Sequence, residues 1–292
     1  MSDDARRVTA IGGGHGLATT LRALRRRTDQ ITAVVSVADD GGSSGRLRAA
    51  MGLPAVGDLR KCLAALADAD SPLAAVLDHR FDGGELDGHA FGNLLVAALT
   101  RTNVDLESAL AHAGQLCEIV GRVLPATTGP AVLIGTTADG RRVEGQVNVM
   151  QTAGIVSVEI GPADAHPPPA VIDAIRTADQ VVIGPGSLFT SVLAALVVPG
   201  IAEALLETKA HVVFVCNLAA QPPETAGLDV AAHVAALHRH GVRPDVVLHD
   251  PSMLGGSEGV VGSVSVPLVG PDQRVHDPAL LSEALWNVTG TI

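Results

Sequence analysis

The stretch Ile31-Thr-Ala-Val-Val-Ser-Val-Ala-Asp-Asp-Gly-Gly-Ser-Ser-Gly-Arg46 joins an apolar run directly to a loop of small and charged residues. Ile31–Ala38 is short and rich in β-branched residues, as strands of a parallel sheet covered on both faces are. Glycine lets the backbone approach a ligand closely, and successive N–H groups in such a turn bind anions. The two serines add donors, and Arg46 can bind a phosphate through a two-pronged contact. We therefore predict an α/β fold with a site for a phosphorylated ligand at the carboxyl end of this strand. The residues expected to contact it are Asp39, Asp40, Gly41, Gly42, Ser43, Ser44, Gly45 and Arg46.

A second glycine loop precedes the first and has the same chemistry. It follows a short predicted strand, Arg7–Ile11, and opens an amphipathic helix predicted over Leu17–Arg27. Backbone donors at a helix N-terminus bind anions with the help of the helix dipole. A dinucleotide fingerprint would need its third glycine where Leu17 stands, so the spacing argues against NAD. The expected ligand contacts here are Gly12, Gly13, Gly14, His15 and Gly16.

Further candidate residues follow later strands or open helices. Gly184, Gly186 and Ser187 form a third glycine turn after the predicted strand Gln180–Ile183. Another predicted strand, His211–Cys216, is followed by amides and hydroxyls that can read base edges or acetamido groups. The predicted contacts from this loop and from a helix start elsewhere are Asn217, Gln221, Glu224, Thr225 and Asn93.

Alternating strands and helices predict one doubly wound, mainly parallel sheet in a single domain over residues 1–292. Successive helical patterns without a strand suggest a helical insertion at about 57–119, in which Asp105 is an N-cap candidate. A hairpin, Ala131–Thr137 and Arg142–Val149 around an Asp-Gly turn, suggests an antiparallel insertion at about 131–160.

Composition excludes several classes of protein. The net charge of −11 argues against nucleic-acid binding, which needs a basic face. No apolar run reaches the roughly 20 residues of a membrane span, and the N-terminus lacks a secretory h-region. The three cysteines suggest reduced core thiols in a cytoplasmic protein. No spacing suggests an activated nucleophile, so no catalytic residue is assigned.

Taken together, these motifs resemble those of the YvcK/CofD-like family, and of its YvcK branch in particular. Asp39–Arg46 and Gly88–Leu94 carry the most specific part of the resemblance, and the matching runs cover nearly the whole chain. The resemblance implies a Rossmann-like sheet. For the CofD branch it implies Mg²⁺-dependent transfer of phospholactate to a deazaflavin alcohol. Asp39 and Asp58 match the positions of the carboxylates that bind the metal in that branch. For the YvcK branch it implies binding of a UDP-sugar, notably UDP-N-acetylglucosamine, with roles in cell shape, wall-precursor supply and gluconeogenic growth.

Two functions of different class follow. The first is a UDP-sugar sensor, expected to form a homo-oligomer and to act on an enzyme of wall-precursor synthesis, with no certain cofactor and Mg²⁺ as a candidate. The second is an Mg²⁺-dependent phosphotransferase of the CofD kind. Aromatic residues are only 2% of the chain, and many relatives carry Tyr where this chain has Phe189. A deazaflavin ring would call for aromatic partners, so the composition favours the sensor.

Overall fold

A seven-stranded sheet forms the centre of the computed structural model, which describes residues 6–68, 71–102, 105–270 and 275–288. Every neighbouring pair of strands is parallel, in the order β10-β9-β8-β7-β1-β2-β3. The predicted α/β class is therefore confirmed. The strands are β1 (Val8–Gly12), β2 (Ile31–Val35), β3 (Arg122–Pro125), β7 (Gln180–Ile183), β8 (His211–Val215), β9 (Val246–His249) and β10 (Ser263–Ser265).

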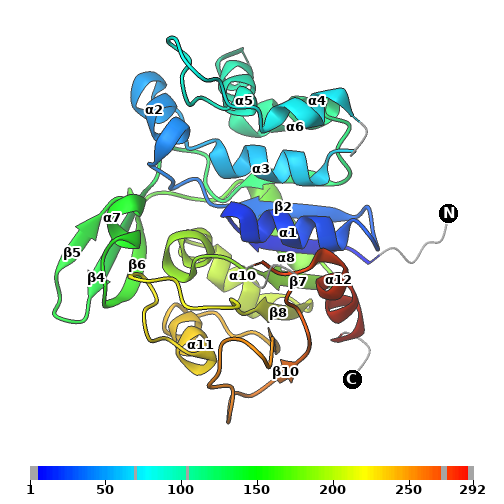
Figure 1. Cartoon of the computed structure of the whole chain (residues 1–292), viewed down its shortest axis with the longest axis vertical. Helices are drawn as coiled ribbons and strands as arrows, with labels where there is room; N and C mark the ends of the chain where they lie inside the picture. Colours follow the sequence, from blue (N-terminus) through cyan, green and yellow to red (C-terminus); the bar gives the residue numbers. More distant parts are fainter. Residues whose placement is uncertain (1–5, 69–70, 103–104, 271–274, 289–292) are drawn as a thin grey trace.

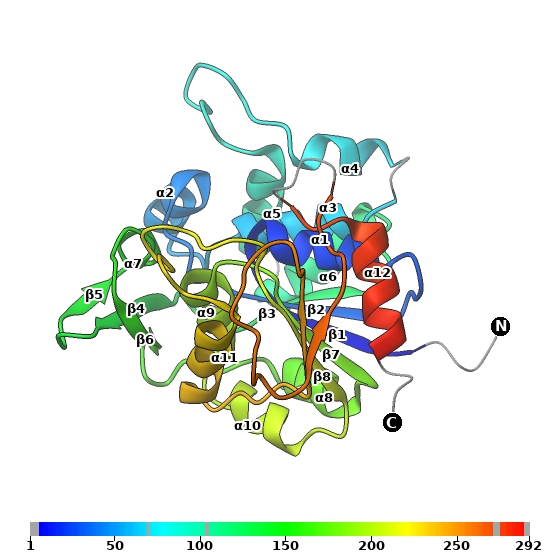
Figure 2. The same ribbon diagram turned by 60° about the horizontal axis from the view of Figure 1, so that its bottom comes forward.

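Helices cover both faces of the sheet, which is why its central strands are apolar along their whole length. On one face α1 (Gly14–Leu24) packs between α3 (Gly57–Leu66) and α12 (Pro278–Asn287). On the opposite face α8 (Pro169–Thr177) packs against α10 (Ile201–Glu207), as Figures 1 and 2 show. A π-helical turn η1 (Leu188–Leu193), α9 (Ala194–Leu196) and α11 (Val230–Arg239) complete the later connections.

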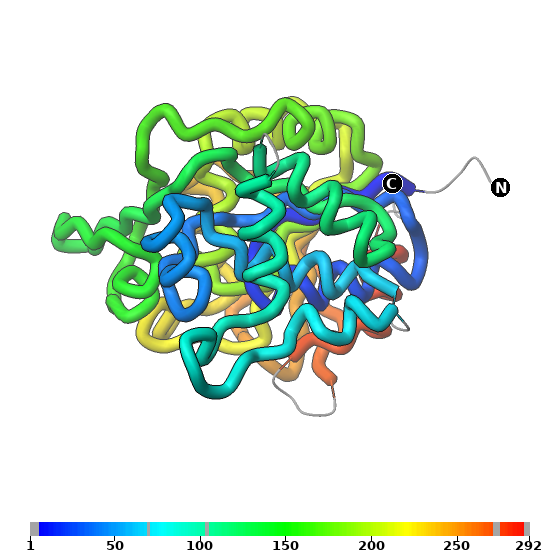
Figure 3. The backbone as a smooth tube through the Cα atoms, turned by 90° about the horizontal axis from the view of Figure 1, so that it is seen from above, coloured from blue at the N-terminus to red at the C-terminus, as the bar shows by residue number. Residues whose placement is uncertain are grey.

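The connection from β2 to β3 consists of helices that lie over one side of the sheet. They are α2 (Gly42–Met51), α3, α4 (Pro72–Leu77), α5 (Phe91–Thr102) and α6 (Leu106–Leu116). Seen from above, this blue-to-teal part of the chain crosses in front of the sheet (Figure 3). The Asp105 carboxylate accepts a hydrogen bond from Ser108 N at 2.7 Å, so the predicted N-cap is confirmed. The sequence pattern predicts a helix over Gly57–Ala69; α3 covers Gly57–Leu66, and Ala69 lies outside the described residues.

Two predicted boundaries were wrong because tertiary contacts override local preference. Residues 42–46 were expected in a loop, but they form the first turns of α2. Ser43 and Ser44 are buried there, and Ser44 Oγ accepts a hydrogen bond from Gly57 N at 2.7 Å. The helix after β1 begins at Gly14 and ends at Leu24, not at Leu17 and Arg27. Strand β3 and helix α8 were not anticipated.

The antiparallel excursion has strand order β5-β4-β6, with β4 (Val132–Thr137), β5 (Arg142–Glu144) and β6 (Ile155–Gly161). It projects from the side of the main sheet (green in Figure 1). The predicted strand Arg142–Val149 is only partly correct, since it ends at Glu144 and helix α7 (Gln146–Met150) follows. Gly145, at φ +95°, turns the chain between them.

The core contains the three cysteines as buried free thiols. Within the part of the chain that the structure describes, no single helix has the length and hydropathy of a membrane span. One pair bent by 71°, Leu188–Leu196 with Ile201–Glu207, passes that test only when taken together.

Candidate functional site

Three glycine loops lie together at the carboxyl edge of the main sheet. They follow β1, β2 and β7, and these strands are immediate neighbours with β1 in the middle. The chain leaves β1 toward β2 on one side and returns to β7 on the other. The gap between β1 and β7 is therefore the topological switch point, where open α/β sheets bind ligands.

The first and third loops are in direct backbone contact. A Cβ atom on Gly16 would lie 2.1 Å from the carbonyl oxygen of Pro185, so only glycine fits there. Thr20 Oγ1 donates a hydrogen bond to Gly184 O at 2.8 Å, and Gly186 N donates to Asn217 Oδ1 at 3.0 Å. The loops after β1, β7 and β8 thus form one connected wall.

A cavity of about 230 Å³ opens against this wall. Ligand pockets for complete small molecules usually measure about 300–1,000 Å³, so this cavity has room for one part of a sugar nucleotide. Five of the residues predicted from the sequence line it. The lining residues are His15, Gly16, Thr19, Pro185, Gly186, Asn217, Leu218, Ala219, Ala220, Gln221, Val275 and His276.

Asp58 connects the first loop to helix α3. Its carboxylate accepts hydrogen bonds from Gly14 N at 2.7 Å and from Lys61 Nζ at 2.9 Å. The nearby Lys61 charge lowers the pKa of His15, and partial burial adds to this effect. The N–H groups of His15 and Gly16, in the first turn of α1, have no partner within their own helix. They are the donors that this helix N-terminus can offer to an anion.

Asp39 and Asp58 lie close enough to interact electrostatically. Burial raises the pKa of Asp39, and the negative charge of Asp58 raises it further. The hydrogen bond that Asp39 accepts from Gly41 N at 3.0 Å lowers this pKa and offsets part of the rise. Mg²⁺ commonly binds through one or two carboxylates together with waters and substrate phosphates, so this pair fits the ion that the resemblance implies. No group of three or more His, Cys, Asp or Glu side chains arranged for a metal occurs within residues 6–68, 71–102, 105–270 and 275–288.

The second loop is tied to the helical insertion. Ser43 Oγ lies 3.1 Å from His89 Nδ1 and accepts from Asn93 Nδ2 at 3.0 Å. Asn93 Oδ1 in turn accepts from Arg60 Nε at 3.0 Å, and Arg60 pairs with Asp78. Since Ser43, Asn93 and Arg60 are all buried, this network fixes the position of the loop. Gly41 O accepts the Gly45 N–H at 2.9 Å in the first turn of α2.

Arg46 lies on the exposed side of α2. Its Nη2 donates to the carbonyl of Asp87 at 2.7 Å, in the long loop between α4 and α5 that projects in Figure 2. The side chain does not line the cavity. Its predicted contact with a phosphate therefore requires the ligand to extend from the cavity along the sheet edge past β2.

Several residues predicted as ligand contacts are engaged by the fold. Both oxygens of Asp40 accept backbone hydrogen bonds at the start of α7, from Gln146 N at 3.0 Å and Val147 N at 2.9 Å. Glu224 is buried and accepts from Phe189 N, Thr190 N and Thr190 Oγ1 at 2.8–3.1 Å. Thr225 Oγ1 accepts from Gln221 N at 2.7 Å. The side chain of Ser187 does not cap the turn that it precedes.

Two functional candidates were missed in the sequence. Lys61 was passed over, although its place three residues after Asp58 on a helix is a recognisable signal. His276 was also missed, because only the folded chain brings it to the cavity beside His15. Phe189 is 1% exposed and packs in the core, so it presents no face for a base to stack on.

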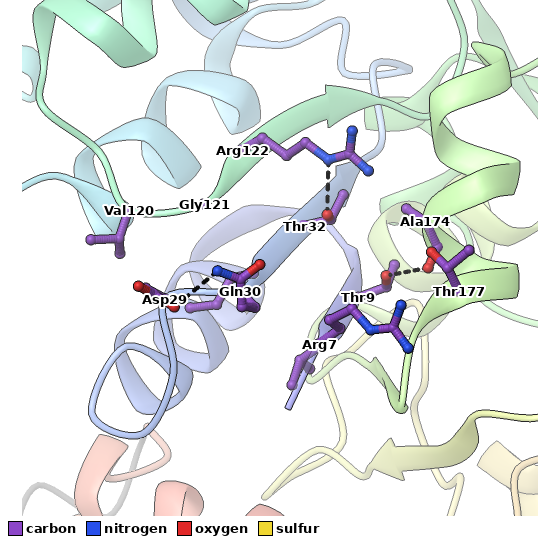
Figure 4. Close-up of a pocket in the computed structure, with 12 residues that line it drawn as sticks. Arg7, Thr9, Asp29, Gln30, Thr32, Val120, Gly121, Arg122, Ala174 and Thr177 are labelled. Atoms are coloured by element: carbon purple, nitrogen blue, oxygen red, sulfur yellow. Dashed lines mark hydrogen bonds between the residues drawn. The ribbon is translucent and has the colours of Figure 1, made fainter. Parts of the chain in front are cut away.

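Other cavities lie away from this edge. One of about 480 Å³ lies at the amino edge, between the starts of β1, β2 and β3, where Arg122 Nε donates to Thr32 Oγ1 at 3.0 Å (Figure 4). An apolar one of about 820 Å³ lies between β10 and α12. None of the predicted ligand contacts lines either of them.

Comparison with known proteins gives consistent results. A model of the protein family described as 2-phospho-L-lactate transferase CofD matches residues 8–258. The gluconeogenesis factor of Bacillus subtilis strain 168 is 42% identical over 236 residues, which is 80% of this chain and 74% of that protein. Proteins provisionally named gluconeogenesis factors are 46% identical in Nostoc sp. and 41% identical in Deinococcus radiodurans, over 79% and 97% of this chain.

The matched region spans 51% of the Nostoc protein and 66% of the Deinococcus protein. A crystal structure of a UPF0052 family member from Bacillus halodurans matches with a TM-score of 0.92 and 35% identity. That match covers 97% of this chain and 99% of the other.

Proposed function

Since this chain belongs to the family described as 2-phospho-L-lactate transferase CofD, we propose that it is a regulatory protein that binds a UDP-sugar. UDP-N-acetylglucosamine or a close relative of it is the proposed ligand. In this proposal an enzyme of cell-wall precursor synthesis reads the bound state, and the protein supports cell shape during growth on gluconeogenic carbon. The name of the Bacillus subtilis relative, gluconeogenesis factor, supports the link to gluconeogenic growth.

One observation carries the proposal: the cavity lies beside the N-terminus of α1 at the switch point of the sheet, between two glycine loops in contact. A helix N-terminus favours a pyrophosphate, and the cavity beside it has room for a single ring. The remainder of the ligand would extend past Asp39 toward Arg46. The described residues of the lining include no Phe, Tyr or Trp and combine polar groups with small aliphatic side chains, which suits a sugar or a pyrimidine better than a deazaflavin.

A specific observation supports the transferase as a second candidate. Asp39 and Asp58 form a partly buried acidic pair, in which burial and then the like charge of Asp58 raise the pKa of Asp39. A divalent cation would relieve that repulsion and draw a pyrophosphate toward the pair. Bound Mg²⁺ would supply charge neutralisation for a phosphoryl group. Asp39 and Asp58 would hold the ion, and Lys61 would keep Asp58 in position.

Calorimetric titration with UDP-, GDP- and ADP-sugars tests the proposal. We expect UDP-N-acetylglucosamine to bind, with Arg46→Ala weakening it by roughly ten- to hundredfold through loss of a charge-assisted contact. Arg48→Ala is the matched control, because it removes the same charge from the same helix two residues away. Absence of UDP-sugar binding to the unmodified chain contradicts the proposal. Equal affinities of the two arginine variants for the ligand would show that Arg46 of α2 does not contact it.

Titration in the presence of a chelator separates the two candidates. The sensor should bind its ligand through backbone donors with little dependence on metal. Strict dependence on Mg²⁺, together with phospholactate transfer to a deazaflavin alcohol, would favour the transferase instead.

A further inference from the structure

His276 contributes a hydrogen-bond acceptor to the wall of the cavity. The residue lies after β10, just before the Asp277 N-cap of α12, and far in sequence from the glycine loops. Its side chain is almost fully buried, with 7% exposed. Its Nε2 atom lies 3.1 Å from the carbonyl oxygen of Cys216, at the carboxyl end of β8.

This contact determines which ring nitrogen carries the proton. A carbonyl oxygen can only accept, so Nε2 must be protonated and must donate to Cys216. Burial lowers the pKa of His276 to about 4, so the ring is neutral at physiological pH. A neutral imidazole with Nε2 protonated has a lone pair at Nδ1.

No partner for Nδ1 occurs among the residues that the structure describes. Nδ1 is also not among the buried side-chain atoms that lack a partner, so it keeps accessible surface, and the residue that carries it lines the cavity. The hydrogen bond from Nε2 to Cys216 holds the ring, which cannot turn without losing that bond. An acceptor fixed in this way is a selective element, since a ligand group without a donor would leave it unpaired.

We propose that His276 is a specificity-determining residue, which accepts a hydrogen bond at Nδ1 from an amide or imide N–H of the bound ligand. This inference rests on the proposed function and identifies the chemical group that the cavity takes. In a UDP-sugar two groups have that chemistry, the imide of the uracil ring and the acetamido group of an N-acetylated sugar. Both are flat and small enough for a space of about 230 Å³.

A pair of variants separates the two roles of the imidazole. In His276→Gln the side-chain amide reaches the place of Nε2 and can still donate to Cys216, but it offers no acceptor where Nδ1 was. In His276→Asn the amide oxygen lies near the place of Nδ1, but the shorter side chain cannot reach Cys216. A structural role would be kept by Gln and lost by Asn, whereas ligand recognition would show the opposite pattern.

The probes are UDP-N-acetylglucosamine, UDP-glucose and the N3-methylated form of UDP-N-acetylglucosamine, titrated calorimetrically into the full chain and both variants. We expect His276→Gln to weaken UDP-N-acetylglucosamine by roughly tenfold or more, and His276→Asn to retain more of the affinity. The analogue that lacks the recognised N–H should bind the unmodified chain more weakly and be insensitive to His276→Gln. If UDP-glucose is the probe that binds weakly and does not respond to the substitution, the recognised group is the acetamido N–H. If the N3-methylated probe behaves in this way, the recognised group is the imide N–H of the base.

The outcomes are distinct. Binding by the unmodified chain with the same affinity in His276→Gln overturns this inference and leaves the proposed function standing. Equal loss for all three probes in His276→Gln also overturns it, because a selective acceptor must distinguish them. If no probe binds the unmodified chain, the proposed function fails and this inference fails with it.

Discussion

Glu224 shows how a single residue with suitable chemistry can be taken up by the fold. It stands in a loop rich in polar groups, and by type it could contact a ligand. In the structure both of its oxygens accept hydrogen bonds from the start of η1, and burial raises its pKa. It therefore joins the loop after β8 to the loop after β7. A direct contact of Glu224 with the ligand stays a prediction.

The pH dependence of stability should report on His276. Between about pH 6.5 and pH 4 the unfolded chain binds a proton at this residue and the folded chain does not, because burial outweighs the attraction of the Asp250 charge. Stability is therefore fully present above pH 6.5 and falls as the pH drops toward 4, by up to roughly 3 kcal/mol. Urea unfolding of the unmodified chain and of His276→Gln at pH 7 and pH 5 measures this effect. Parallel losses in the two proteins would contradict it.

The contact between the first and third loops depends on the absence of a side chain at Gly16. A methyl group there would overlap the carbonyl of Pro185, whose backbone cannot yield as a flexible side chain would. Gly16→Ala should destabilise the fold by about 1–3 kcal/mol, the usual cost of overpacking, and should weaken ligand binding. Gly129→Ala is the control, since a Cβ there meets nothing within 4 Å. Thermal unfolding with equal midpoints for the two variants would show that the loops can separate.

At the scale of elements, α7 depends on a residue outside its own segment. Asp40 caps this five-residue helix from the loop after β2 and so connects the antiparallel sheet to the candidate site. Asp40→Ala should remove about 1 kcal/mol of local stability, as the loss of an N-cap usually does. Hydrogen exchange should then be faster in residues 142–161 than in the main sheet. Glu144→Ala, an exposed change in β5, is the control, and equal exchange in the two variants would mean that other contacts hold α7.

At the scale of the whole molecule, ligand binding should affect parts that are far apart in sequence. The three glycine loops and the segment Gln221–Leu228 follow strands that all end at one edge of the sheet. A ligand shifts a loop only through its different affinity for two states. The exposed residues of this segment, on either side of the buried Glu224 and Thr225, are the part in which we expect a second state. With UDP-N-acetylglucosamine bound, hydrogen exchange should slow in these four segments. Uniform slowing across the sheet, or slowing confined to β4–β5, would place the response elsewhere.

The sequence by itself determined the class of fold and the chemistry of the edge. The spacing of apolar residues and the composition suffice for the fold class, because a parallel sheet covered on both faces needs short apolar strands. The glycine loops that follow these strands lie at the carboxyl edge of the sheet, where ligands bind in such folds. Only the tertiary structure decided which polar groups line the cavity and which are engaged by the fold. Asp40, Glu224 and Ser43 are engaged by backbone or side-chain partners from 34 to 107 residues away, whereas His276 reaches the cavity from the far end of the chain. A hydrogen bond between such distant segments leaves no local pattern, since its partner is set by packing and not by spacing along the chain.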